Sequence, residues 1–566
     1  MRKLLATLLL PACLLPQPAL SYSMRHASKP FVPMVDNQAF RDEIISYVRG
    51  IAINQIKQTP LQNLQTLDAT WNNSYQKSDW SVHVSLYHLG NKVGEGTSHG
   101  SSLAEVLKKA TDMSLKPQPT DRLNEAELNH YRFKVAFDYY PARRYSFIEY
   151  GEKGLELTGS RVAVRTMTAD SLKEQIKNSE AYLLKTMHPQ LHGFFKFYNA
   201  GKDKQQELLR TIYSSSSLYT LLMLYRAHPD QRLSAQFKPI ADFILSNQVN
   251  EGPHAGGFYY GYNPETQKKS CRVVVGTTSK TIFTLLELNQ FYPDEPKYLA
   301  AAKHAGDWLL TRVNQDGTVM PVASCTSGQW KDSKKQSFLY SGQVLSALSR
   351  LYGVTHDQRY HQGALKIAGQ FLKQIQTQGF IVGDDYRPAN SISSSWVMMS
   401  LIDLAKVDNN PVYRQTIDDI AKAILARQIT DKNDIYSNGR YLDAMTTSGN
   451  GWINEVMGVL YQFCTQQGGS QCQRYREAMI LTSRWLLQNA YTPQNSYNVK
   501  NPERAIGGFI TNFTTRTVRT DAVCHGVNSL IMLLSTSGDG NKPLINLPER
   551  PLIEILPLLR AGNGFL

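Results

Sequence analysis

The segment 516–530, RTVRTDAVCHGVNSL, has the highest density of side chains suited to proton transfer and anion binding in this chain. Asp521 and His525 are four residues apart, so in a helix they lie on one face, where the carboxylate can orient the imidazole or share a proton with it. Arg516 and Arg519 precede them and offer guanidinium groups to a substrate carboxylate. A helix-capping aspartate beside solvated arginines would explain the same residues. We interpret Asp521 and His525 as candidate catalytic residues and the two arginines as candidate substrate ligands.

A tryptophan and a carboxylate stand close together in the segment NGWINEVMG, where Trp452 and Asn454 precede Glu455. An aromatic ring can stack on the face of a sugar while a neighbouring carboxyl group transfers a proton. A glutamate that caps the first turn of a helix, beside a tryptophan of the core, is the structural alternative. We interpret Glu455 as a candidate catalytic residue, with Trp452 and Asn454 as candidate substrate ligands.

A third candidate segment, IVGDDYRP, contains Asp384, Asp385, Tyr386 and Arg387. Hydrolysis of a glycosidic bond uses two carboxyl groups about 5 to 10 Å apart. One of the two aspartates, together with Glu455 or Asp521, could supply such a pair from different parts of the chain. A solvated turn is the alternative, since adjacent aspartates are common in turns.

Further aromatic side chains in expected loops could line a sugar-binding groove, with one aspartate nearby: Tyr260, Tyr262, Tyr340, Trp396 and Asp443. The sequence contains no CxxC or HExxH motif, so we expect no metal site and no cofactor.

The elements that position these residues repeat along the chain. Apolar helix ends that run into polar, glycine-containing stretches recur every 53 to 65 residues. One series of expected helices is apolar: 218–227, 281–291, 343–352, 396–407, 456–464 and 527–534. The alternating series is amphipathic: 235–248, 296–314, 359–377, 411–428 and 473–490. A sixth amphipathic helix could come from 170–212.

Six apolar helices inside six amphipathic ones resemble the (α/α)6 toroid, or six-hairpin, superfamily, over residues 168–540. The resemblance implies a mainly α fold and a function among glycoside hydrolases, polysaccharide lyases or uronyl epimerases, although terpenoid cyclases and prenyltransferase subunits use a similar toroid. In such a ring the starts of the inner helices meet at one face, where the candidate residues should gather. An open helical solenoid that binds a partner is the alternative.

The region 35–167 has a different pattern, which predicts a smaller α+β domain. SVHVSLYHL alternates as a strand does, and SSLAEVLKKA reads as a helix. The order of elements, with the phrase EYGEKGLELTGSRVAVRTM, resembles the AMMECR-type domain. The Arg-Gly-Cys-Ile-Gly run of that family is replaced by KVGEGTSHG, so the resemblance implies a fold and no activity.

The N-terminus predicts export. Arg2 and Lys3 precede a short apolar run, and small residues near position 21 suit cleavage, so residues 1–21 are interpreted as a signal peptide and the protein as periplasmic or secreted. Five cysteines then remain, so at least one has no partner within the chain; Cys464 and Cys472 could close a small loop, and Cys271 could pair with Cys325 if their loops adjoin. Residues 541–566 form a C-terminal tail.

Composition and charge argue against two further classes, membrane-spanning proteins and nucleic-acid-binding proteins. The chain has 566 residues, 42% of them hydrophobic, and a formal net charge of +14, yet no stretch long enough to span a membrane and no basic run typical of nucleic-acid binding. Together with the candidate carboxylates, the resemblance to the toroid superfamily implies a carbohydrate-active enzyme that cleaves or modifies glycosidic linkages by carboxylate acid/base catalysis. Its ligand would be a poly- or oligosaccharide, and an acidic one if the positive charge lies at the cleft. A non-catalytic envelope protein that uses the toroid as a binding surface is the alternative, and the oligomeric state stays open.

Overall fold

The protein is seen in a computed structural model that describes residues 38–57, 80–116, 127–139, 143–538 and 542–548. The predicted signal peptide, residues 1–21, and most of the predicted tail lie outside these residues. No helix among them is long and apolar enough to cross a lipid bilayer.

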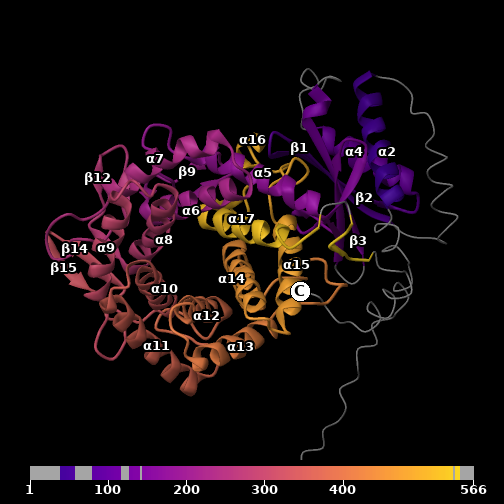
Figure 1. The fold of residues 1–566 in the computed structure, drawn as a ribbon. Coiled ribbons are helices and arrows are strands. Elements are labelled where there is room, and N and C mark those ends of the chain that lie inside the picture. The colour runs from indigo at the N-terminus through magenta and orange to yellow at the C-terminus, as the bar shows by residue number, and fades with distance from the viewer. Residues whose placement is uncertain (1–37, 58–79, 117–126, 140–142, 539–541, 549–566) are drawn as a thin grey trace, which may run out of the picture.

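Six helices form a closed inner ring (Figure 1), and each packs against the next, the last against the first. They are α6 (Thr211–Ala227), α8 (Val275–Phe291), α10 (Phe338–Thr355), α12 (Ser391–Ala405), α14 (Thr447–Gln466) and α17 (Thr520–Leu534). Because α17 contacts α6, the ring has no open ends. The open solenoid that the sequence allowed is therefore wrong.

Six outer helices cover the ring, and each packs against an inner one. They are α5 (Ala169–Thr186), α7 (Gln231–Ser246), α9 (Lys297–Leu310), α11 (Gln358–Gln378), α13 (Pro411–Leu425) and α15 (Cys472–Gln488). In α11 the buried residues Tyr360, Ala364, Ile367 and Phe371 recur every three or four positions, which gives one apolar face towards the ring. Helix α5 supplies the sixth outer helix expected from 170–212, so the mainly α toroid is confirmed.

The inner helices begin earlier than their apolar runs predicted. Helix α12 starts with serines at 391 and 393–395, all of them fully buried, and α14 starts at Thr447, nine residues before the expected apolar run. Small side chains let the helices approach one another closely, while their hydroxyls bond to backbone carbonyls, as Ser394 does to that of Asn390. A hydrophobicity pattern therefore misses these turns.

The N-terminal region forms a smaller domain with one six-stranded antiparallel sheet in the order β2-β1-β3-β4-β5-β6. Its strands are β1 (Trp80–His88), β2 (Asn91–Gly100), β3 (Tyr131–Tyr139), β4 (Arg143–Tyr150), β5 (Lys153–Thr158) and β6 (Arg161–Val162). Helices α2 (Gln38–Lys57) and α4 (Leu103–Leu115) pack against the sheet over a shared apolar core, and the short helix η2 (Glu127–His130) precedes β3. The α+β prediction is confirmed; the resemblance to the AMMECR-type domain stays a prediction.

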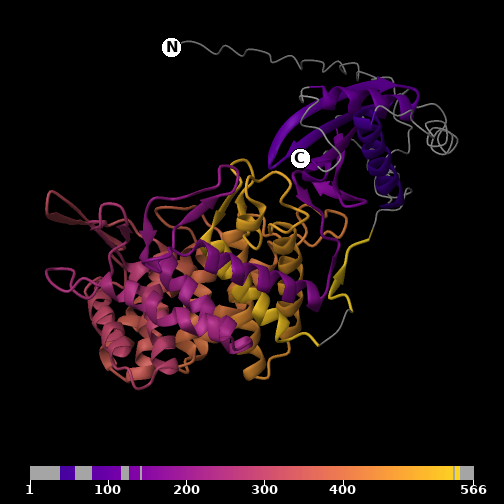
Figure 2. The same ribbon diagram turned by 90° about the horizontal axis from the view of Figure 1, so that it is seen from above.

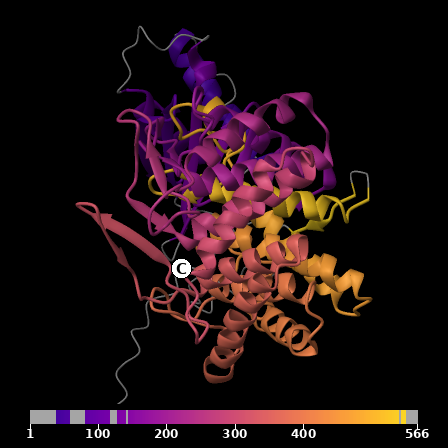
Figure 3. The same ribbon diagram turned by 60° about the vertical axis from the view of Figure 1, so that its left-hand side comes forward.

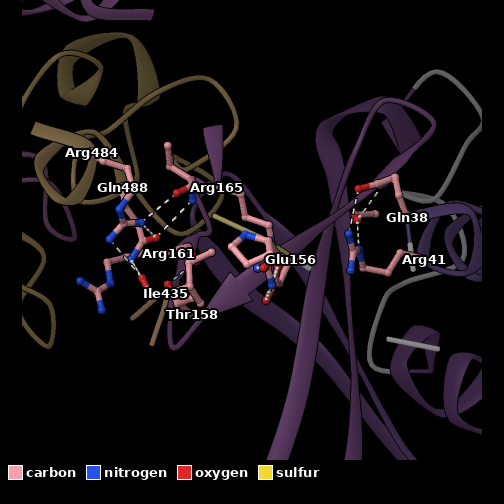
Figure 4. A network of polar contacts seen from close by, with 12 residues as sticks. Gln38, Arg41, Glu156, Thr158, Arg161, Arg165, Ile435, Arg484 and Gln488 are labelled. Atoms are coloured by element: carbon pink, nitrogen blue, oxygen red, sulfur yellow. Dashed lines mark hydrogen bonds and ion pairs between the residues drawn. The ribbon is translucent and has the colours of Figure 1, made fainter. Parts of the chain in front are cut away.

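The smaller domain lies beside the toroid (Figure 2), and buried arginines join the two (Figure 4). Arg484 of α15 is fully buried and donates from Nη1 to the carbonyl of Val164 at 2.8 Å and from Nη2 to that of Asn438 at 2.6 Å. Arg161 of β6 bonds to Asn489 and lies over the rings of Tyr436 and Phe513. Strand β7 (Thr166–Met167) then pairs with β18 (Ile545–Asn546), so part of the predicted tail returns to the domain boundary.

Short strands and one short helix lie in the loops before the inner helices (Figures 1 and 3). They are β8 (Phe197–Asn199), β9 (Lys204–Gln205), β10 (Leu209–Arg210), β11 (Gly261–Asn263), β12 (Lys268–Lys269), β13 (Arg272–Val274), β14 (Val322–Thr326), β15 (Gln329–Asp332), α16 (Pro502–Ala505), β16 (Ile510–Asn512) and β17 (Thr517–Arg519). Disulfides join Cys271 to Cys325, beside the β13–β14 pairing, and Cys464 to Cys472. Cys524 is the free, buried cysteine among the described residues.

Candidate active site

A cavity of about 360 Å³ lies where the first turns of the six inner helices meet. We call it the near cavity. Each inner helix contributes at least one lining side chain, as in the set Tyr213, Thr277, Tyr340, Trp396, Trp452 and His525. The ring is therefore the element that brings residues from six distant segments to one place, as the toroid resemblance implied.

A histidine and a glutamate from neighbouring inner helices form a hydrogen-bonded pair at this cavity. His525 Nδ1 of α17 lies 2.5 Å from Glu455 Oε2 of α14, and both side chains are about nine-tenths buried. Asn528 Nδ2 donates to the other carboxylate oxygen of Glu455 at 3.1 Å. The second ring nitrogen of His525, Nε2, has no hydrogen-bond partner among the described residues, while the residue lines the near cavity. The pair has the arrangement of an imidazole oriented by a carboxylate.

The electrostatics keep Glu455 ionised. Burial by itself raises the pKa of a carboxyl group, but His525, Lys280 and the Asn528 amide favour the carboxylate and together hold the pKa of Glu455 below its ordinary value. An ionised carboxylate only accepts hydrogen bonds, so His525 Nδ1 is the donor and Nε2 is left to exchange a proton with a ligand.

Asp521 is held by an arginine at the edge of the same cavity. Arg519 donates to its carboxylate from Nε at 2.9 Å and from Nη2 at 2.6 Å, and the same Nη2 donates to the Tyr213 hydroxyl at 3.1 Å. Burial raises the pKa of Asp521, and Arg519 and His525 outweigh that effect, so the pKa lies below its ordinary value. Asp521 is therefore held as an anion paired with Arg519.

Cations outnumber anions around the near cavity. Lys196, Lys280, Arg387 and Arg519 line it, whereas Asp521 is its one acidic lining residue among the described residues. Burial, followed by repulsion from Arg519 and Arg210, lowers the pKa of Lys196, which indicates a positive potential at the mouth. Because Arg519 is matched by Asp521, the two lysines and Arg387 remain to attract a negatively charged ligand.

Two tryptophans form the floor of the cavity. Trp396 and Trp452 stack with ring centroids 3.6 Å apart, and His525 meets the Trp452 ring edge-on at 5.0 Å. Both indoles are 3% exposed, so Trp452 is part of a buried stack and not the exposed sugar platform that the sequence suggested. Lys280 Nζ lies 5.4 Å from each indole centroid. The stack therefore fixes the positions of His525 and Lys280.

The predicted aspartates outside the ring cap inner helices. Asp384 Oδ2 accepts from the amide of Phe338 at 2.7 Å, at the start of α10, and Asp443 Oδ2 accepts from the amide of Ser391 at 2.9 Å, at the start of α12. Asp385 Oδ2 accepts from the amide of Gln336 at 2.7 Å. Asp384 and Asp385 line a separate cavity of about 160 Å³, so the structure does not bring them together with Glu455 or Asp521.

The other predicted ligands divide between the cavity and its surroundings. Tyr260, Tyr340, Arg387, Trp396, Trp452 and Arg519 line the near cavity. Tyr262 packs against Phe243, Tyr386 is 47% exposed, Asn454 donates to Ser483, and Arg516 donates to the carbonyl of Asn498. These last four do not line it.

Sequence reasoning missed several residues that line the cavity, among them Lys196, Tyr213 and Lys280. Lys280 could have been identified as a candidate from the sequence, because it is the single cation of the apolar helix VGTTSKTIFTLLELNQF. Lys196 lies in a loop whose sequence has no recognisable pattern, and Tyr213 lies beside serines that carry no hydrophobic periodicity. In the described part of the chain, no group of three or more His, Cys, Asp or Glu side chains is placed to hold a metal ion.

No protein-family model and no curated protein sequence matches this chain. Its fold is similar to that of a sugar epimerase from a ruminal bacterium, with 12% identity and a TM-score of 0.50, over 66% of this chain and 100% of the epimerase. Cellobiose 2-epimerase from Bacillus thermoamylovorans B4167 is similar at 13% identity and a TM-score of 0.50, over 65% and 99%. A family 76 glycoside hydrolase from a bovine Bacteroides thetaiotaomicron strain matches at 13% identity and a TM-score of 0.45, over 81% and 94%. The two epimerase similarities establish the (α/α)6 toroid fold, and at these identities they establish the fold alone.

Proposed function

We propose that the protein is a carbohydrate-active enzyme that cleaves or modifies glycosidic linkages of an acidic poly- or oligosaccharide, with His525 as the residue that moves the proton. The observation that carries the proposal is the Glu455–His525 hydrogen bond, which leaves His525 Nε2 without a protein partner beside a cavity lined by cations. The solved structures of similar fold include sugar epimerases, which supports a sugar ligand.

The charge states favour histidine chemistry over a pair of acidic groups. Hydrolysis by two carboxyl groups needs one of them protonated, to donate to the leaving oxygen. Glu455 and Asp521 are both held ionised by their partners. We therefore place Glu455 as the residue that orients His525, and Asp521 as the residue that holds Arg519 at the cavity edge. This revises the carboxylate acid/base catalysis inferred from the sequence.

Removal of a proton from the carbon beside a uronate carboxyl group suits this arrangement. His525 Nε2 would accept the proton, Glu455 would stabilise the imidazolium through Nδ1–H, and the cations of the cavity would stabilise the negative charge that develops on the carboxylate. Delivery of a proton to the opposite face of that carbon, from a second donor or from water, gives an epimerase, whereas loss of the neighbouring glycosidic oxygen, which takes up a proton as it leaves, gives a lyase. Both reactions use the same first step.

The proposed location is the periplasm or the exterior of the cell. Two disulfides are formed, as is typical of proteins in oxidising compartments. The predicted signal peptide points to the same location.

The experiment is a screen of the secreted protein against uronate-containing and neutral glycans. Lyase activity is followed by the absorbance of the unsaturated product, and epimerase activity by NMR detection of deuterium incorporated from heavy water. We expect turnover of an acidic glycan that His525→Ala abolishes. The matched control is His361→Ala, because His361 forms a similar bond to Asp408 at 3.0 Å on the outer ring.

Turnover that survives in His525→Ala at the wild-type rate would refute the assignment of the proton-transfer residue. If no glycan is turned over but acidic glycans bind, and binding weakens in Arg387→Gln, the alternative holds: a non-catalytic envelope protein that binds glycans in the toroid.

A further inference from the structure

A second cavity, of about 370 Å³, opens at the opposite end of the ring, between the C-terminal halves of the inner helices. We call it the far cavity. It shares three lining residues with the near cavity, Ser216, Lys280 and Trp452, so the two cavities meet on the axis of the toroid. Its volume lies within the range of small-molecule sites, which begins at about 300 Å³. The proposed function does not use it.

Each carboxylate that lines the far cavity already has a side-chain partner. Glu287 pairs with Arg226 at 2.5 Å, Asp403 accepts from Arg350 Nε at 2.8 Å, and Glu455 is bonded to His525. Paired carboxylates of this kind do not need a ligand cation. The cavity is therefore not arranged to bind a positively charged molecule.

Unsatisfied donors remain in the same cavity. Lys280 Nζ has no hydrogen-bond or ion-pair partner among the described residues, although it lies beside the stacked rings of Trp396 and Trp452, 5.4 Å from each centroid, and burial lowers its pKa. Arg350 uses only Nε in its bond to Asp403, and both of its Nη groups are without a protein acceptor in the described part of the chain. The Ser349 hydroxyl is fully buried with no hydrogen-bond partner.

The walls around these donors suit a small hydroxylated molecule. The Arg350 guanidinium lies 4.2 Å from the centroid of the Phe283 ring, which keeps the guanidinium plane in place. Tyr219 and Trp452 add aromatic surface, while the side chains of Gln290 and Gln462 add amide donors and acceptors. A stacked guanidinium with free Nη groups binds a carboxylate through two parallel hydrogen bonds.

We propose that the far cavity is a second binding site for a monomeric sugar acid, whose carboxylate pairs with Arg350 and Lys280 and whose hydroxyls bond to the glutamines and Ser349. Because Glu455 lines this cavity while its partner His525 lines the near one, occupancy of the far site acts directly on the acid–base pair. The site does not depend on turnover in the near cavity.

The test is a calorimetric titration of the full-length protein with D-glucuronate, and with D-glucose as the uncharged analogue. We expect glucuronate to bind and glucose to bind at least about tenfold more weakly, since a hydrogen-bonded charge pair is worth about 1.5 to 3 kcal/mol. Arg350→Gln should weaken glucuronate binding about tenfold or more. Arg387→Gln, which alters the near cavity alone, should leave this binding within about twofold.

Arg350 also supports Asp403, so a variant that keeps the fold intact is needed as a second measure. Lys406→Glu reverses a charge at the cavity mouth, where the lysine side chain is 47% exposed, and should weaken glucuronate binding several-fold. Lys422→Glu makes the same change on an exposed position of the outer helix α13 and should not.

Three results would overturn the proposal: no binding of glucuronate, equal binding of glucose, or binding that Arg387→Gln removes and the far-cavity variants leave unchanged. The last result would assign the ligand to the near cavity alone. None of them bears on turnover, which the His525→Ala comparison decides separately.

Discussion

His525 and Glu455 are joined by a hydrogen bond of 2.5 Å, yet they face different cavities: His525 lines the near cavity and Glu455 the far one. The bond therefore joins the neighbouring helices α14 and α17 at the level where the two cavities meet. A change in the charge of one residue alters the electrostatic potential in the cavity that the other residue lines, because both side chains are almost fully buried and little water screens them.

Replacement of Glu455 tests its orienting role. Glu455→Gln keeps the shape of the side chain but removes the charge that stabilises a protonated His525, so we expect kcat on the acidic substrate to fall on the order of 100-fold or more. The KM should change much less. The measurement is steady-state kinetics over pH. An unchanged kcat and pH profile, with the protein folded, would contradict an orienting role.

Acid stability follows from the same residues. The pKa values of Glu455 and Asp521 are lowered in the folded protein, so both carboxylates contribute stability that is present above their unfolded pKa values, about 4, and is lost as the pH falls through the lower folded values. We expect the free energy of unfolding to decline below about pH 4. Urea denaturation at a series of pH values should show a weaker decline in Glu455→Gln and Asp521→Asn.

We expect the charged Lys280 side chain to lower the stability of the folded protein and to strengthen the binding of anions. Its pKa is lowered because burial disfavours the charged amine, so the ammonium costs stability at neutral pH, and that cost disappears as the pH rises through the folded pKa. We expect Lys280→Met to raise the thermal midpoint at pH 7 and to weaken anion binding in both cavities. A lowered midpoint would indicate that its attraction to Glu455 outweighs its burial.

The two disulfides should contribute unequally. Cys271 and Cys325 are 54 residues apart and Cys464 and Cys472 are 8 apart. In the chain-entropy model these loops correspond to about 4 and about 2.5 kcal/mol. We expect paired Cys→Ser substitution of the first disulfide to lower the thermal midpoint more than that of the second. Reduction of the wild-type protein serves as the reference, and the reverse order would exclude the entropic account.

Arg484 should be essential for attachment of the N-terminal domain. Arg484→Met leaves the carbonyls of Val164 and Asn438 without their donor inside the protein, at a cost of about 1 to 3 kcal/mol for each buried group. We expect a lower midpoint and faster proteolysis near residues 160–168. Arg232→Met is the control, since its pair with Asp230 is exposed to solvent and contributes little to stability. Equal effects of both substitutions would contradict the prediction.

Much of the fold followed from local patterns. The alternation of apolar and amphipathic helices predicted the toroid, and the strand pattern around 81–89 predicted the α+β domain, because burial of one helix face or one sheet face imposes a periodicity on the sequence. The helix starts were misplaced, since the serines of α12 are buried through backbone hydrogen bonds and not through hydrophobicity.

The sequence by itself identified the segments that hold the candidate residues, and Asp521 and His525 were recognisable as a pair because four-residue spacing on a helix is a local property. Only the tertiary structure decided their partners. Glu455 is 70 residues from His525 in the sequence, and closure of the ring brings the two side chains together. Asp384 was an equally good carboxylate candidate from the sequence, but in the structure it caps α10. Lys280 likewise lies beside the indole stack and lines both cavities only because the helices pack into a ring, which its residue type does not determine.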